Sequence, residues 1–119
     1  MDREAMAVLE KMVEQVETGH WTTGTYHRPG TATKSDSRCA VGMVRSFGGY
    51  QGSLHNRVIA ALNATIPEDF SPVGFEDEFP TRHATDRVIL YNDRGPRSRK
   101  RAADWFRQAI RAASMQDPA

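Results

Sequence analysis

Apolar residues recur every three or four positions near both ends of the chain, a spacing typical of amphipathic helices. At the start, this pattern predicts a helix over residues 3–18, with Asp2 as its N-cap and Gly19 at its end. At the other end, the last helix is predicted to begin near Ser98. Its apolar stripe lies opposite a basic face, so we expect one side to be buried and the other exposed.

The middle of the chain predicts two shorter helices. One runs over 38–47, and either Asp36 or Ser37 can cap it, because short polar side chains bond to the free N–H groups of a first turn. The other is capped by Ser53 and ends before Pro67, since proline disfavours helical conformation in the residue before it.

Three further stretches have no clear helical period. Residues 20–37, rich in Thr, Gly and Ser, predict a long irregular loop or a short hairpin across 21–27. Residues 67–80 hold three prolines and three phenylalanines, and predict an extended strap pinned by its rings. Residues 81–91 suit a strand or a helix, and we favour a helix. The predicted fold is mainly α, a compact bundle of about four to five helices.

The length of the chain indicates one domain. At 119 residues it can bury a core without disulfides, so we expect a single domain over 1–119 with a frayed tail at 115–119. A single cysteine cannot form an internal disulfide, and the N-terminus does not have the basic flank and apolar run of a signal peptide. No apolar run approaches the roughly 20 residues of a membrane span. These features favour a cytoplasmic protein outside the membrane.

Charge is polarised along the chain although the formal net charge is only +1. Residues 1–17 carry five acids against two bases, 65–78 carry five acids and no base, and 94–111 carry seven bases against one acid. The basic end could bind nucleic acid through phosphate contacts, or pair internally with the acidic stretches. The candidate phosphate contacts are Arg97, Arg99, Lys100, Arg101 and Arg107.

Three short motifs stand in a fixed order. They are Gly19-His20-Trp21-Thr22-Thr23-Gly24, then Cys39-Ala40-Val41-Gly42, then Tyr91-Asn92-Asp93 ahead of the final helix. This order resembles a family of uncharacterised small proteins of actinobacteria and their phages, a domain of unknown function with Trp-x-x-Gly, Cys-Ala-x-Gly-Ala and Trp-Asn-Asp motifs. Met43 and Tyr91 depart from that pattern, where the family usually has alanine and tryptophan. The resemblance supports the predicted architecture and implies a phage or actinobacterial origin, but it implies no mechanism.

Cys39 is the candidate nucleophile, because the first turn of a helix favours a thiolate. A histidine would act as its base and an amide or carboxylate would orient that base, as in Cys-His-Asn enzymes. The residues that could take these roles are His20, His27, His55, His83, Asn92 and Asp93. We favour the alternative, that Cys39 is a small buried residue at a close helix contact.

Aromatic residues are the candidate contacts for a ligand or partner. They are Trp21, Tyr26, Phe75 and Tyr91. Rings with nearby polar groups line small-molecule sites, yet large rings in a thin core more often serve packing. For Asn92 and Asp93 we favour side-chain bonds to the backbone of the turn before Pro96.

The leading hypothesis is a small accessory protein of phage or actinobacterial origin that binds a host protein or a small ligand and performs no catalysis. If phage-encoded, it would act in the host cytoplasm. We expect no metal and no cofactor, because no CxxC, HExxH or phosphate-binding loop occurs. Two alternatives stay open: a nucleic-acid-binding protein using the basic C-terminal helix, and a cysteine-dependent hydrolase or transferase using Cys39.

Overall fold

Five helices make up most of the part of the chain that the computed structural model describes, which is residues 1–23, 27–30, 37–70 and 84–116. They are α1 (Arg3–Glu17), α2 (Ala40–Gly48), α3 (Ser53–Ala64), α4 (Ala84–Arg94) and α5 (Arg99–Ser114). Two very short strands, β1 (His27–Arg28) and β2 (Ser37–Arg38), pair between α1 and α2. The predicted bundle of about four to five helices is confirmed. No helix in these ranges is long and apolar enough to span a bilayer.

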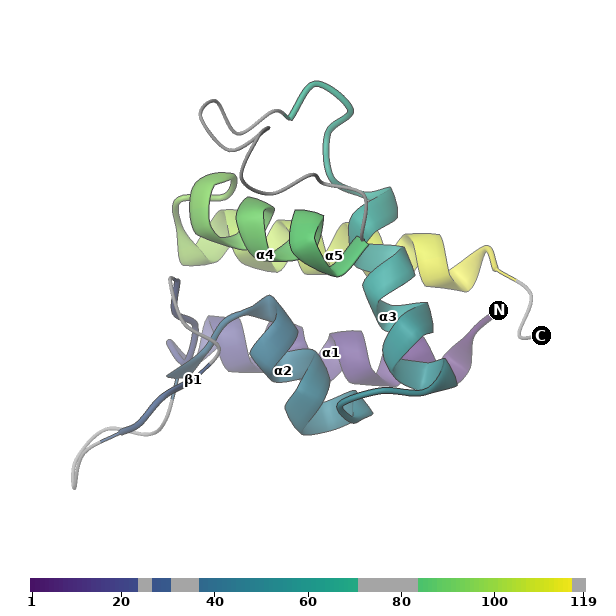
Figure 1. Cartoon of the computed structure of the whole chain (residues 1–119), viewed down its shortest axis with the longest axis horizontal. Helices are drawn as coiled ribbons and strands as arrows, with labels where there is room; N and C mark the ends of the chain where they lie inside the picture. Colours follow the sequence, from purple (N-terminus) through teal and green to yellow (C-terminus); the bar gives the residue numbers. More distant parts are fainter. Residues whose placement is uncertain (24–26, 31–36, 71–83, 117–119) are drawn as a thin grey trace.

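Helices α1 and α5 form an antiparallel pair at the back of the bundle. In Figure 1, α1 lies behind α2 and α5 lies behind α4, while α3 crosses between the lower and upper parts. The pair is tied at both ends: Asp2 donates its backbone N–H to the Ala113 carbonyl at 3.0 Å, and Arg107 of α5 forms an ion pair with Glu17 of α1. The end of α1 therefore lies beside the first half of α5.

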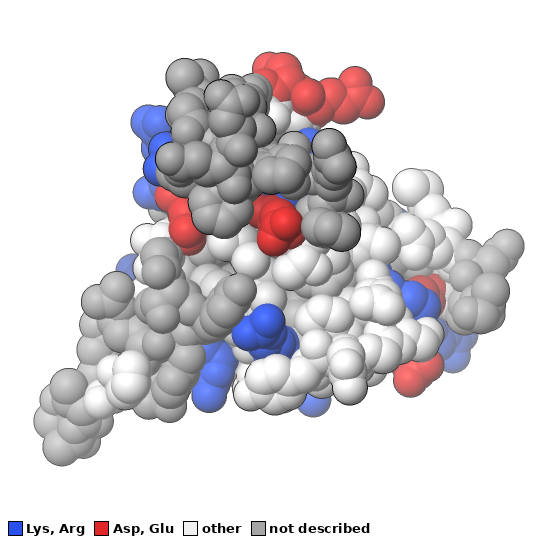
Figure 2. Space-filling view, in the orientation of Figure 1, with Lys and Arg blue, Asp and Glu red and all other residues white. Residues whose placement is uncertain are grey.

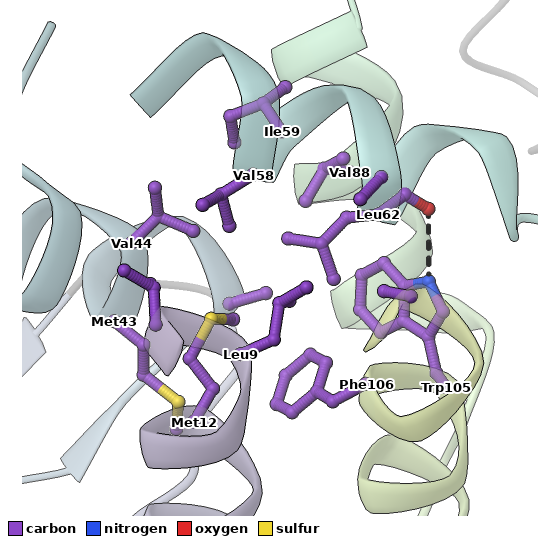
Figure 3. Packing of buried hydrophobic residues seen from close by; sticks show 14 of the residues in the cluster. Leu9, Met12, Met43, Val44, Val58, Ile59, Leu62, Val88, Trp105 and Phe106 are labelled. Carbon is purple, nitrogen blue, oxygen red and sulfur yellow. Dashed lines mark hydrogen bonds between the residues drawn. The ribbon is translucent and has the colours of Figure 1, made fainter. Parts of the chain in front are cut away.

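The core lies where all five helices meet. All five helices contribute large, fully buried side chains, among them Leu9, Met43, Leu62, Val88 and Phe106. Figure 3 shows them interdigitating, with the Trp105 indole at one edge donating its N–H to the Leu62 carbonyl at 3.1 Å. This bond closes the last turn of α3 onto α5.

The two outer helices form as their patterns predict. Helix α1 matches the predicted range 3–18, with Asp2 as its N-cap. It ends at Glu17, with Thr18 as its C-cap, and Gly19 follows with a φ of 87°, a left-handed conformation that glycine adopts without strain. Helix α5 begins where predicted, because Ser98 Oγ accepts the Arg101 N–H at 3.2 Å. The ambiguous stretch 81–91 is helical from Ala84 onward, as α4.

Asp2 also joins α1 to α3. Its Oδ1 accepts the Ala5 N–H at 3.1 Å and its Oδ2 accepts Arg57 Nε at 2.8 Å. Burial by itself raises the pKa of this carboxyl, but the hydrogen bonds from Arg57 and Ala5 and the charge of Arg57 leave the pKa below its ordinary value. Asp2 is thus a buried, ionised cap.

Helix α2 begins later than its predicted range of 38–47. Its N-cap is Cys39, with extended backbone, and not one of the two polar residues predicted for that role. The reason is that Arg38 is held by neighbouring backbone: its N–H donates to the His20 carbonyl at 2.8 Å and its carbonyl accepts the Thr22 N–H at 3.1 Å. Pairing with the segment at His20 and Thr22 on one side, and with β1 on the other, keeps Arg38 extended and excludes it from the helix.

Two further boundary predictions need correction. Ser53 is the first residue of α3 and not its cap, because Gly52 takes the N-cap position without a side-chain hydrogen bond. The short hairpin near 20–37 exists, but it does not run across 21–27. His27 pairs with Arg38 in the antiparallel register, while Trp21 forms a parallel bridge to the same residue.

The turn from α4 to α5 is set by a close approach of ring to backbone. A Cβ at Gly95 would lie 2.3 Å from Tyr91 Cε1, so only glycine allows the tyrosine ring to rest there. Phe70 packs against the same ring edge-on, at 5.0 Å between centroids. Residues 71–80 of the predicted strap and 117–119 of the predicted tail lie outside the described residues.

Candidate functional site

The three sequence motifs meet at the side chain of Asn92, in the last turn of α4. Asn92 is 1% exposed, and its Oδ1 accepts the Trp21 indole N–H at 2.7 Å and the Ala40 backbone N–H at 3.1 Å. Its Nδ2 donates to the Thr22 carbonyl and to Asp93 Oδ1, both at 3.2 Å. Two acceptor and two donor bonds satisfy the amide completely. We call Trp21, Thr22, Cys39, Ala40, Asn92 and Asp93 the Asn92 node.

This geometry overturns the turn role predicted for Asn92. Its amide does not cap the chain before Pro96, because it lies inside α4 and bonds to segments 52 and 71 residues away. By accepting the Ala40 N–H, it caps the start of α2 from another helix. The node therefore fastens the beginning of α2 and the segment at Trp21 to the end of α4.

Cys39 shares the capping of α2. Its Sγ accepts the Gly42 N–H at 3.4 Å, and the residue is 3% exposed. Burial raises the pKa of the Cys39 thiol, the hydrogen bonds from Gly42 and Val41 act in the opposite direction, and the charge of Asp93 raises the pKa again. The net shift is upward, so the thiol is protonated at neutral pH. This environment opposes the thiolate that a nucleophile needs.

Of the candidate bases, His20 and His55 do not complete a catalytic set with Cys39. His20 Nδ1 lies 3.2 Å from Thr18 Oγ1, at the end of α1. His55 is buried in α3, with Nδ1 2.8 Å from the Gly49 carbonyl, past the far end of α2. His83 lies outside the described residues. The charge of Asp93 disfavours ionisation of the thiol.

A second feature is a hollow of about 520 Å³ between the end of α1 and the start of α5. It is lined by Val16, Glu17, Arg99, Lys100, Ala103 and Arg107, which we call the α1–α5 hollow. Val16 and Ala103 are buried and apolar, whereas the charged residues are exposed. Three cations and one carboxylate give the lining a formal net charge of +2.

The cations of the hollow differ in whether they form ion pairs. Arg107 pairs with Glu17 and, at 3.4 Å, with Asp104. In the described part of the chain, neither Arg99 nor Lys100 forms an ion pair. The predicted internal pairing of basic and acidic ends thus occurs at Arg107 and leaves two cations available at the same hollow.

The remaining basic residues of α5 face elsewhere. Arg101 lines a smaller hollow, of about 270 Å³, together with Tyr91, Trp105 and neighbouring residues on the α4 side of the helix. Arg97 lies before α5 and lines neither hollow. In Figure 2, blue atoms gather at the upper left, where Figure 1 shows the connection between α4 and α5. The five predicted phosphate contacts therefore do not share one hollow.

The predicted aromatic contacts are separated. Trp21 is half-buried, with its indole N–H held in the Asn92 node. Tyr91 is half-buried between Phe70 and Trp105, and burial raises the pKa of its phenol. Tyr26 and Phe75 lie outside the described residues. Within the described ranges, no group of three His, Cys, Asp or Glu side chains could hold a metal ion.

Sequence reasoning missed the connection between the motifs and the hollow between α1 and α5, although it offered a pairing between the charges of these two ends of the chain. The fixed order of the motifs was a signal that they interact, but it did not identify Asn92 as the residue that joins them. For the α1–α5 hollow, the signal was charge: an acidic first helix and a basic last helix favour each other as neighbours.

The molecule thus belongs to the class of small helical bundles with a buried polar node that joins three separated motifs. Residues 1–112 match DUF6197, a family of unknown function. The match covers nearly the whole chain, so the chain belongs to this family, and the predicted relation to a domain of unknown function is confirmed. No curated protein and no solved structure matches the chain.

Proposed function

We propose that the chain is a small accessory protein of phage or actinobacterial origin, which binds a host protein or a small ligand and performs no catalysis. The observation that supports this function best is the contrast between two sites. The only thiol is buried and held protonated, while Arg99 and Lys100 are exposed beside a hollow of about 520 Å³. Chemistry is disfavoured at the first site and binding is favoured at the second.

The Asn92 node suits a structural role. All four hydrogen-bonding positions of the Asn92 amide are used within the protein, so none is left for a substrate. A network that is fully satisfied and buried fixes one arrangement of the chain. The node is therefore the scaffold that holds α2 and α4 together.

The α1–α5 hollow suits a partner that carries negative charge. Its formal charge of +2 is set over a buried apolar floor formed by Val16 and Ala103. Among the described residues, Arg99 and Lys100 of this hollow form no ion pair, and two neighbouring cations suit a compact anionic group.

A capture experiment tests the proposal. Wild-type protein, Cys39→Ser and the double variant Arg99→Gln with Lys100→Gln are immobilised and exposed to an actinobacterial lysate, and retained proteins and small molecules are identified by mass spectrometry. We expect wild type and Cys39→Ser to retain the same partner or ligand, and the double variant to lose it. Failure of wild type to retain anything specific contradicts the proposal.

The same proteins separate the alternatives. A mobility shift with DNA or RNA at low salt that weakens in the double variant would favour nucleic-acid binding. A changed phenotype in cells that carry Cys39→Ser, together with rapid iodoacetamide labelling of the native thiol, would favour a cysteine-dependent enzyme.

A further inference from the structure

We infer that two copies of the chain associate through the surface of residues 46–66, which form the end of α2, the connection and α3. We call this surface the α2–α3 face, and its partner is the same face of a second copy. This association is independent of the proposed function and of the α1–α5 hollow. The charge of the face, the small side chains on α3 and the exposed ring of Tyr50 support it.

The α2–α3 face differs from the rest of the surface in charge. Nine of its residues are exposed and none of the nine is charged, whereas 17 of the 26 other exposed residues in the described ranges are charged. Figure 2 shows the same contrast, with white atoms gathered over α2, α3 and their connection. Depletion of charge distinguishes the centre of a protein interface from the surface around it. The face is therefore suited to contact with another protein.

The single charge within residues 46–66 is neutralised inside the protein. Arg57 is 23% exposed, and its Nε lies 2.8 Å from Asp2 Oδ2. Its Nη2 lies 3.2 Å from Glu4 Oε1. An arginine that already pairs with a buried carboxylate adds no uncompensated charge to the face, so covering the face leaves no cation stranded.

Charge also favours a second copy as the partner. In an interface with twofold symmetry the same patch contacts itself, so charges near the axis meet their own copies. A patch without exposed charge avoids this repulsion, and the formal net charge of +1 keeps the long-range repulsion between copies weak. A partner recognised by charge would find its complement on the rest of the surface, where acids and bases are exposed.

Helix α3 allows close approach of a second helix. Its exposed residues recur every three or four positions, so they form one stripe along the helix. They are Ser53, Asn56, Ala60 and Ala64. Small side chains let two helices pack near the short end of the usual separation, which is roughly 8–10 Å between axes. Two copies of α3 can therefore face each other, with Ala60 close to the twofold axis.

Tyr50 is the aromatic anchor of the face. Among the described residues it is the one exposed aromatic side chain, at 76%. The guanidinium carbon of Arg45 lies 5.7 Å from the centroid of its ring. His55 Nδ1 donates to the carbonyl of the preceding residue, Gly49, at 2.8 Å. These contacts restrict the ring before association, so less conformational freedom is lost, and tyrosine is enriched among residues that dominate binding energy.

Sedimentation velocity over a range of protein concentrations tests the inference. Wild type is compared with Tyr50→Ser, Ala60→Glu and Ala60→Lys on the face. The matched control is Ala7→Glu, because Ala7 is exposed on α1, outside the face. A further sample mixes Ala60→Glu with Ala60→Lys in equal amounts, so that opposite charges can meet across the axis. Circular dichroism checks that each variant folds.

We expect wild type to sediment as a dimer that dissociates on dilution. Each variant on the face, measured alone, should raise the dissociation constant of the dimer by at least about tenfold, because it removes the anchor or sets like charges against each other. The control should stay within about twofold of wild type. The mixture should regain the dimer, which two variants that had merely lost their fold could not do.

A wild type that stays monomeric at every concentration overturns the inference. A dimer that the face variants leave intact, or that the control weakens equally, also overturns it. A mixture that does not regain the dimer contradicts pairing of α3 with its own copy. A lysate protein captured by monomeric wild type and lost in Tyr50→Ser would assign the face to a different partner. The proposed binding function fails separately, because Arg99→Gln with Lys100→Gln lies outside the face and should leave the dimer intact.

Discussion

Replacing Asn92 with alanine removes an amide that joins three separated parts of the chain. Four hydrogen bonds are lost, with lengths of 2.7 to 3.2 Å. The Ala40 N–H is left in a fully buried site, where an unmet donor costs about 1–3 kcal/mol. The indole N–H of Trp21 loses its acceptor on a half-buried residue, which water partly replaces. We expect the free energy of unfolding to fall by about 3 kcal/mol in total.

The assay is urea and thermal unfolding, followed by circular dichroism. Unfolding entropy is about 2.1 cal/mol/K per residue, so for this chain about 3 kcal/mol corresponds to about 12 °C in Tm. Asn56→Ala is the matched control, because Asn56 is exposed on α3. A loss below about 1 kcal/mol for Asn92→Ala, or one equal to that of the control, would refute the role assigned to the Asn92 node.

Three further predictions concern a carboxylate, a glycine and the thiol. Asp2→Asn keeps a capping acceptor but loses the ion pair with Arg57. Because folding lowers the pKa of Asp2, the ionised carboxylate stabilises the folded state at pH values above the pKa of the unfolded chain. The stability difference between wild type and this variant in urea should therefore shrink as pH falls below about 4. Gly95→Ala should cost about 1–3 kcal/mol in thermal unfolding, because its methyl group meets the Tyr91 ring, while Gly48→Ala in α2 should be neutral or stabilising. Iodoacetamide should label native Cys39 on the order of a hundredfold more slowly than the unfolded chain, as followed by mass spectrometry.

Each of these has a contrary outcome. A stability difference at Asp2 that is constant from pH 7 to pH 3 would show that its charge contributes nothing. Equal Tm values for the two glycine variants would mean that the Tyr91 ring moves aside at no cost. Labelling of native Cys39 at the rate of the unfolded chain would place the thiol at the surface and reopen the enzyme hypothesis.

Local patterns predicted the parts of the fold that depend on neighbours in the sequence. The helix over 3–18 and the helix after Ser98 have long apolar stripes and polar caps, and both form where expected. The stretch 81–91 favoured a helix only marginally, because Val88, Ile89 and Leu90 are also typical of strands. Tertiary packing of α4 against its neighbours stabilises the helical conformation of this stretch.

The predictions that were wrong concern positions fixed by contacts with residues far away in the sequence. Nothing in the residues around Cys39 indicates that Arg38 is held in extended pairing by the segment at His20 and Thr22, which delays the start of α2. Asn92 acts by accepting hydrogen bonds from Ala40 and Trp21, which lie 52 and 71 residues away in the sequence. Periodicity and turn preference describe short stretches, so they cannot supply contacts of that separation.

The first turn of α5 departs from local preference in its charge. Asp2 and Ser98 cap their helices as their chemistry favours, and Gly19 and Gly95 occupy positions that other residues would strain. Three consecutive cations at the N-terminus of α5 go against the helix dipole, at about 0.3–1 kcal/mol each for exposed groups. Departures from local preference are expected at functional or strained sites. The binding function proposed above is therefore best tested first with variants of the exposed Arg99 and Lys100, because the amide of Asn92 is already satisfied within the protein.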